Sequence, residues 1–164
     1  MVKGTRVAIA YPPLKSGKGV ALLTQNRQFQ WFSRPTYIFP VVPATAATML
    51  RSAGCDVLFL DGIAAEMSPE DFDARLEEFR PNVLVIETKT PVVKRHWAWI
   101  EKFSAKMSDA GMPVRVVMVG DHVTALPQES AEKPGVWAII PGGESVFIGE
   151  DAFGQCAEDF CILY

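Results

Sequence analysis

The chain has 164 residues, of which 49% are hydrophobic, and its formal net charge is −3. This length suits one domain whose core needs no disulfide or metal, and the composition excludes general disorder and gives no sign of nucleic-acid binding. No apolar run approaches the ~20 residues that span a bilayer, so no membrane partner is expected. Three scattered cysteines, Cys55, Cys156 and Cys161, indicate a reduced protein of the cytoplasm rather than a disulfide scaffold.

Five short apolar runs rich in β-branched residues follow one another along the chain. Glycine or proline follows four of them directly, at Pro12, Gly62, Gly120 and Pro141. Near-continuous apolar runs of this length are typical of strands buried on both faces of a parallel sheet. The predicted strands cover residues 6–11, 56–61, 82–87, 114–119 and 136–140.

Helical patterns separate the five runs. The first spans residues 43–53, and the second begins at Ser68, whose hydroxyl suits an N-cap. The third runs over about 92–108, and a short fourth helix follows Thr124, where Pro127 limits it to a turn or two. Strands alternating with helices predict an α/β domain, a Rossmann-like or flavodoxin-like three-layer sandwich around a five-stranded parallel sheet.

The segment of residues 14–37 is too long for an ordinary connection between a strand and a helix. It holds Phe29, Trp31, Phe32 and Tyr37 among polar residues. Because it follows the first strand, we expect it to lie as a loop over the carboxyl edge of the sheet. Two interpretations stay open: a functional loop that covers a ligand or docks another domain, and a surface loop whose aromatic side chains pack on the core.

Candidate binding residues are those that directly follow each predicted strand, because ligands of open parallel sheets bind beyond the carboxyl ends of the strands. Glycines there let a large flat or phosphate-bearing ligand approach the backbone, and threonine hydroxyls can bind amides or phosphate. A buried group of acidic and basic side chains at this edge would have shifted pKa values. The candidates are Pro12, Pro13, Leu14, Asp61, Gly62, Glu87, Thr88, Lys89, Thr90, Gly120, Asp121, His122, Thr124, Pro141, Gly142, Gly143 and Glu144.

Several of these strand ends also carry a resemblance to a known family. A Tyr-Pro-Pro turn closes the first strand, residues 53–61 lead into the second, and residues 119–129 run from Val-Gly-Asp-His through Thr-Ala-Leu-Pro. In order and spacing, these segments resemble the N-terminal cobalamin-binding domains of cobalamin-dependent radical S-adenosylmethionine proteins. Residues 85–90 and 136–144 match the same pattern more loosely, and the resemblance covers about residues 5–146.

The resemblance implies that the sheet edge binds cobalamin, as the cofactor module of a radical S-adenosylmethionine-type methyltransferase or related enzyme. Its implied partner is a radical S-adenosylmethionine catalytic domain or subunit. Cobalamin domains of the mutase type carry a DxHxxG loop after the first strand, whose His coordinates cobalt, and this chain lacks it. The resemblance therefore implies base-off cobalamin with no metal ligand from that loop. His122 follows a different strand, which favours an orienting role; Glu87 replaces the family's usual Ser, and Asp121 its second Gly.

The same resemblance implies the domain boundaries. Residues 1–148 form the cobalamin-binding domain, and residues 149–164 form a C-terminal extension or the start of a missing catalytic domain. Radical S-adenosylmethionine chemistry needs three cysteines, usually spaced CxxxCxxC. The three cysteines of this chain do not have that spacing, so we expect no catalytic residues and no catalysis by this chain alone.

Two other functions fit the same fold. A flavodoxin-like module would bind a flavin or nucleotide, or act in regulation, at the same sheet edge. Its first loop, however, lacks the Gly, Ser or Thr run that holds a phosphate. A small stand-alone enzyme would use Glu87, Lys89, Asp121 and His122, if these side chains meet at the sheet end.

Overall fold

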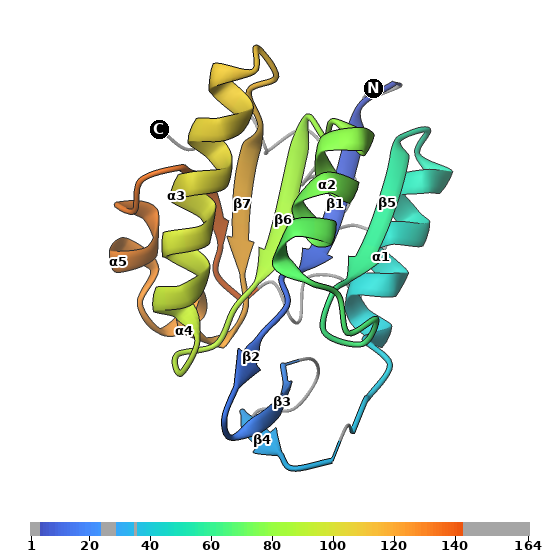
Figure 1. Cartoon of the computed structure of the whole chain (residues 1–164). Coiled ribbons are helices and arrows are strands. Elements are labelled where there is room, and N and C mark those ends of the chain that lie inside the picture. The colour runs from blue at the N-terminus through green and yellow to red at the C-terminus, as the bar shows by residue number, and fades with distance from the viewer. Residues whose placement is uncertain (1–3, 24–28, 35, 143–164) are drawn as a thin grey trace.

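A five-stranded parallel sheet forms the centre of the molecule, as the sequence predicted (Figure 1). The computed structural model describes residues 4–23, 29–34 and 36–142. The strand order is β5-β1-β6-β7-β8. This is the flavodoxin-like order, which reverses direction between β1 and β6. The strands are β1 Arg6–Tyr11, β5 Asp56–Asp61, β6 Val83–Glu87, β7 Arg115–Val119 and β8 Val136–Ile140.

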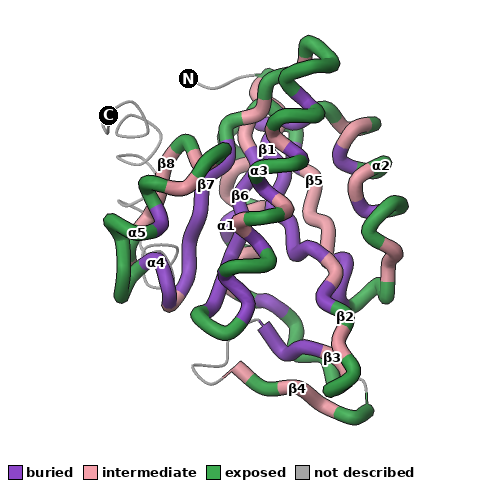
Figure 2. Tube along the Cα trace, turned by 60° about the vertical axis from the view of Figure 1, so that its left-hand side comes forward, coloured by how far each residue is buried: buried purple, intermediate pink, exposed green. Residues whose placement is uncertain are grey.

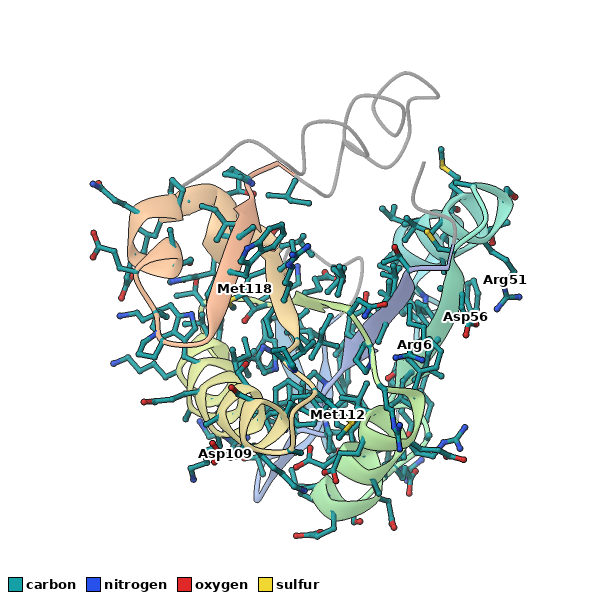
Figure 3. All side chains as sticks on the ribbon, turned by 90° about the horizontal axis from the view of Figure 1, so that it is seen from above. Arg6, Arg51, Asp56, Asp109, Met112 and Met118 are labelled. Atoms are coloured by element: carbon teal, nitrogen blue, oxygen red, sulfur yellow. The ribbon has the colours of Figure 1, made fainter. Side chains whose placement is uncertain are left out.

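Helices cover both faces of this sheet, which gives the three layers (Figures 1 and 3). Helix α1 (Val41–Ser52) packs on one face, where Ala46 is fully buried against residues of β1, β5 and β6. Helices α2 (Pro69–Phe79) and α3 (Val93–Asp109) pack on the other face through Phe72, Leu76 and Ile100. The central strands are buried and the edge strands β5 and β8 only half-buried (Figure 2).

The ends of the helices follow the local sequence. Ser68 caps α2 as predicted, because its Oγ accepts a hydrogen bond of 3.0 Å from the backbone N–H of Asp71. The short fourth helix was placed wrongly: α4 (Asp121–Ala125) begins directly after Gly120, and Thr124 lies inside it. Pro127 then begins a separate helix, α5 (Pro127–Ala131), because proline suits the first helical position.

The segment of residues 14–37 is not the irregular loop that the sequence predicted. Strands β2 (Lys15–Ser16), β3 (Gly19–Leu22) and β4 (Gln30–Phe32) form a small antiparallel sheet beyond the carboxyl ends of the main strands (Figure 1). Ser16 pairs with Gly19, so residues 17 and 18 are a two-residue hairpin turn. Gly19 has φ +109°, and a Cβ there would lie 2.0 Å from the Phe32 carbonyl oxygen.

This small sheet is anchored to the main one by an apolar cluster at the end of β1. Tyr11, Leu14, Leu23 and Val92 are buried in that cluster, and Phe29 and Trp31 pack against it. The expectation that the segment lies over the carboxyl edge is therefore confirmed, and so is core packing of two of its aromatic side chains. None of the helices in the described part of the chain has both the length and the apolar character of a membrane span.

Candidate functional site

The carboxyl ends of all five parallel strands meet at one edge of the sheet, and this edge divides into a closed and an open half. The closed half lies at β1, β5 and β6, where the small sheet β2–β4 also packs (Figure 1). The open half lies at β7 and β8, where Thr124 and Pro141 are exposed among the residues that the structure describes.

In the closed half, a tyrosine and a glutamate form a buried pair on the α1 side of the sheet. The register places Ala10 beside Ile86, so the next residues, Tyr11 and Glu87, are also neighbours. The Tyr11 hydroxyl donates a hydrogen bond of 2.5 Å to Oε2 of Glu87. Burial raises the pKa of the Glu87 carboxyl, against the opposing effects of this hydrogen bond and of Lys89. Burial and the nearby carboxylate raise the Tyr11 pKa well above its ordinary value.

A second pair, between the buried Lys89 and the half-buried Asp121, joins the segment after β6 to the start of α4. Nζ of Lys89 lies 2.6 Å from Oδ2 of Asp121, and the Lys89 side chain is only 3% exposed. Between these elements, Gly120 has φ +110°, and a Cβ there would lie 2.3 Å from the Thr88 carbonyl oxygen. The Gly120 backbone therefore approaches the chain's own β6 end, and its lack of a side chain is required by that contact.

The hydroxyls that follow β6 bind the two histidines on the α2–α3 side. Oγ1 of Thr88 lies 2.9 Å from Nδ1 of His96, and Oγ1 of Thr90 lies 3.1 Å from Nδ1 of His122. The His122 ring also packs edge-on against Trp97, with 5.4 Å between the ring centroids. Both imidazoles are buried, so His122 contacts α3 rather than open solvent at the rim.

The residues after β5 pack within the fold, and those after β1 pack partly within it and partly line a pocket on the α2–α3 side. Asp61 accepts hydrogen bonds from the backbone N–H groups of Ile63 and Ala64. Gly62 is buried, and a Cβ there would lie 2.6 Å from the Phe72 ring. Pro12 and Leu14 are buried where the chain leaves β1, with Pro13 half-buried between them.

In the open half, exposed backbone and one hydroxyl form a shelf, which we call the β7–β8 shelf and define as Thr124, Pro141 and Gly142. Thr124 and Pro141 are exposed. Oγ1 of Thr124 accepts a hydrogen bond of 2.8 Å from the Gly142 N–H and donates to the Gly120 carbonyl. Gly142 has φ +71°, and among the described residues other than its chain neighbours, no atom lies within 4 Å of where its Cβ would be.

The structure thus brings together most of the predicted edge residues but gives them different roles. Not all of these residues are accessible to a ligand: Glu87 and Lys89 are buried after β6, and His122 is buried after β7. Gly143 and Glu144 lie outside the described residues, as do residues 149–164. Sequence reasoning missed Tyr11 and His96 as members of the edge. Tyr11 was detectable, because it ends a strand predicted to lie in the same sheet as Glu87.

Within the described ranges, no three His, Cys, Asp or Glu side chains gather as a set of metal ligands. The Glu87, Lys89, Asp121 and His122 side chains divide into pairs: Glu87 with Tyr11, Lys89 with Asp121, and His122 with Thr90.

The raised pKa of Glu87 makes a prediction about stability and pH. A carboxyl whose pKa is higher in the folded than in the unfolded state destabilises the fold as pH rises through that interval. Gln at this position keeps a hydrogen-bond acceptor for Tyr11 but cannot ionise. We therefore expect the free energy of unfolding of the wild type, relative to Glu87→Gln, to fall as pH rises from about 4.5.

Urea denaturation of both proteins between pH 4.5 and 8 measures this difference. Glu132→Gln, which removes one exposed carboxylate, controls for the change in net charge. A difference between wild type and Glu87→Gln that stays constant with pH, or that grows in favour of the wild type, contradicts burial of an ionisable carboxyl here.

Comparison with known proteins identifies the family. Residues 34–149 match the model of the B12 binding domain. No curated protein and no solved structure gives a significant match. The matched segment includes all of α1 to α5 and four of the five main strands, and it spans well over half of the chain. The chain therefore belongs to the B12-binding domain family, with cobalamin as its cofactor.

Proposed function

We propose that this chain is the cobalamin module of a radical S-adenosylmethionine-type methyltransferase or a related enzyme, and that it holds the corrinoid at the β7–β8 shelf. The proposed location rests on one observation: the two halves of the edge differ in how far their residues are exposed. Thr124 and Pro141 are exposed, whereas Glu87 and Lys89 are buried in pairs. Of the seventeen candidate residues, those of the shelf are the ones that we propose to contact the ring directly.

The shelf has the chemistry that a corrinoid requires. A large flat ring with amide side chains needs an open surface and exposed polar groups rather than a deep apolar pocket. Gly142 carries no side chain that would block a flat ligand, and Thr124 supplies a hydroxyl at its side. Bound cobalamin serves as a methyl carrier, or as an electron-transfer group, while the protein binds and orients it.

The positions of the histidines support binding without an imidazole ligand from this chain. The sequence contains two histidines. His96 and His122 are 1% and 3% exposed, and both contact threonines after β6. The chain leaves β1 through Pro12, Pro13 and Leu14 into β2, so that stretch holds no histidine either. We therefore propose that cobalamin binds in the base-off form, with its lower base displaced.

The Tyr11–Glu87 pair is our reason for placing the cofactor near β7 and β8 rather than at the junction of β1 and β6. Their hydrogen-bonded pair fills the α1 side of the junction between β1 and β6, which is the point where the strand order reverses. Ligands of this fold commonly use that point. Since this chain fills it with its own side chains, we place the corrinoid contacts one and two strands away.

The catalytic partner is the second part of the proposal. The segment of residues 119–129 resembles radical S-adenosylmethionine relatives in its order of residues, and no cysteines here are spaced CxxxCxxC. We propose a cobalamin-binding domain at residues 1–148, with residues 149–164 as a C-terminal extension or the start of a catalytic domain that carries the cluster.

Binding of hydroxocobalamin tests the location and the base-off form together. After mixing and desalting, the protein should retain a corrin absorption spectrum of the base-off type. Pro141→Trp places a bulky ring on the shelf and should weaken binding at least about tenfold, because it removes the room for a flat ligand. Pro113→Trp is the matched control, an exposed proline before β7 at the opposite edge of the sheet.

Equal binding by the two tryptophan variants would overturn the shelf as the site. A base-on spectrum would overturn the proposed coordination. Retention of a yellow flavin instead of the corrinoid would favour the flavodoxin-like alternative.

The catalytic partner is tested separately from the cofactor. The reading frame that continues from this chain, or a neighbouring gene, should encode three cysteines spaced CxxxCxxC. A chain loaded with cobalamin should form a complex with that polypeptide in gel filtration. Absence of such a sequence, or no co-elution, contradicts the radical S-adenosylmethionine assignment while leaving cobalamin binding intact.

A further inference from the structure

A second pocket opens at the carboxyl edge, on the α2–α3 side, and shares no residue with the β7–β8 shelf. Its volume is about 280 Å³, close to the lower end of small-molecule sites, which begins at roughly 300 Å³. Five of its residues are apolar. They come from the exit of β1, the start of α2 and the second turn of α3, and they are Pro12, Pro13, Leu14, Pro69 and Trp99.

The apolar wall is held in place before any ligand arrives. Nε1 of Trp99 donates a hydrogen bond of 2.9 Å to Asp73, and its ring stacks on Phe103 at 5.0 Å with 16° between the planes. Prolines fix their own backbone angle φ. A rigid indole facing rigid proline rings favours a flat apolar group, because little side-chain freedom is lost on binding.

One buried polar group in the wall lacks a partner. His96 lines the pocket and is 1% exposed. Its Nδ1 is paired with Thr88, whereas its Nε2 has no hydrogen-bond partner among the residues that the structure describes. Burial, and secondarily the charge of Arg95, lower its pKa to about 4, so the ring is neutral at physiological pH. A buried unpaired ring nitrogen is costly, and a ligand atom that pairs with it is favoured.

Two cations also line the pocket. Lys15 and Arg95 are exposed, and neither forms an ion pair within the described part of the chain. The Arg95 guanidinium lies 5.8 Å from the centre of the Trp31 ring, which restricts its position. None of the pocket residues is Asp or Glu. The local charge is therefore positive, and a ligand with an ammonium group is disfavoured.

From these features, we propose that the pocket binds a small aromatic carboxylic acid without an amino group. The aromatic ring lies against Trp99 and the prolines. A carboxylate oxygen accepts a hydrogen bond from Nε2 of His96, in the tautomer where the Thr88 hydroxyl donates to Nδ1. Arg95 and Lys15 balance the negative charge. This site is independent of the proposed cobalamin shelf, because it uses a different set of residues on the other side of the edge.

Titration of the full chain with phenylacetate, followed by NMR, tests the proposal. The Trp99 indole N–H and the His96 ring nitrogens should shift in a saturable way. Phenylacetamide, the neutral analogue, should bind at least about tenfold more weakly, and 2-phenylethylamine should give no saturable shift. Equal binding of all three compounds, or saturable shifts that exclude Trp99 and His96, overturns the proposal.

Two substitutions of His96 separate its two nitrogens. H96Q keeps a polar group near the position of Nε2 and should bind phenylacetate within about threefold of the wild type. H96N keeps the contact to Thr88 but has nothing at Nε2, and it should bind at least about tenfold more weakly. The reverse order overturns the role of Nε2.

Surface variants keep the test valid if the His96 variants do not fold. Arg95→Gln should weaken phenylacetate binding about fivefold, whereas Lys94→Gln, an exposed neighbour that does not line the pocket, should leave it unchanged. Equal effects of the two variants contradict a site at Arg95. Hydroxocobalamin binding should be unaffected by phenylacetate, so the two sites succeed or fail independently.

Discussion

Parallel pairing of β1 with β6 is the constraint on which the rest of this structure depends. It brings the carboxyl ends of all five strands to one edge, and its register sets Tyr11 beside Glu87. A carboxyl buried there needs a hydrogen-bond donor, and the tyrosine supplies it within the same sheet layer. The small sheet β2–β4 then packs on the β1 end through Leu14 and Leu23, which closes this half of the edge.

The two halves of the edge differ in how far their residues are buried. Hydrogen-bonded pairs join the end of β6 to β1 and to α4. At β7 and β8, the hydrogen bond between Thr124 and Gly142 holds the backbone while Thr124 and Pro141 stay exposed. Membership in the B12-binding family identifies cobalamin as the cofactor, and the open half is where we propose that it binds. Both histidines are buried on the α2–α3 side. The pocket at His96 and Trp99 shares no residue with the proposed corrinoid surface.

The main sheet could be predicted because each of its strands is a continuous apolar run, such as 114–119, and the cap at Ser68 is a local signal. Strands β2 and β4 were missed because they have two and three residues, too few for a periodic pattern. The pairs at the edge were hidden for another reason. Tyr11 and Glu87 are 76 residues apart, and Lys89 and Asp121 are 32 apart. The sequence could place each residue at the edge, but it could not show which side chains pair there.

Amide hydrogen exchange with and without hydroxocobalamin tests the central claim most directly, because it reports the contact surface without any substitution. We expect added protection of the amides of residues 120–125 and Gly142, in the open half of the edge. Protection confined to the amides of Leu14 and residues 61–65, with none near β7 and β8, would contradict the proposed location.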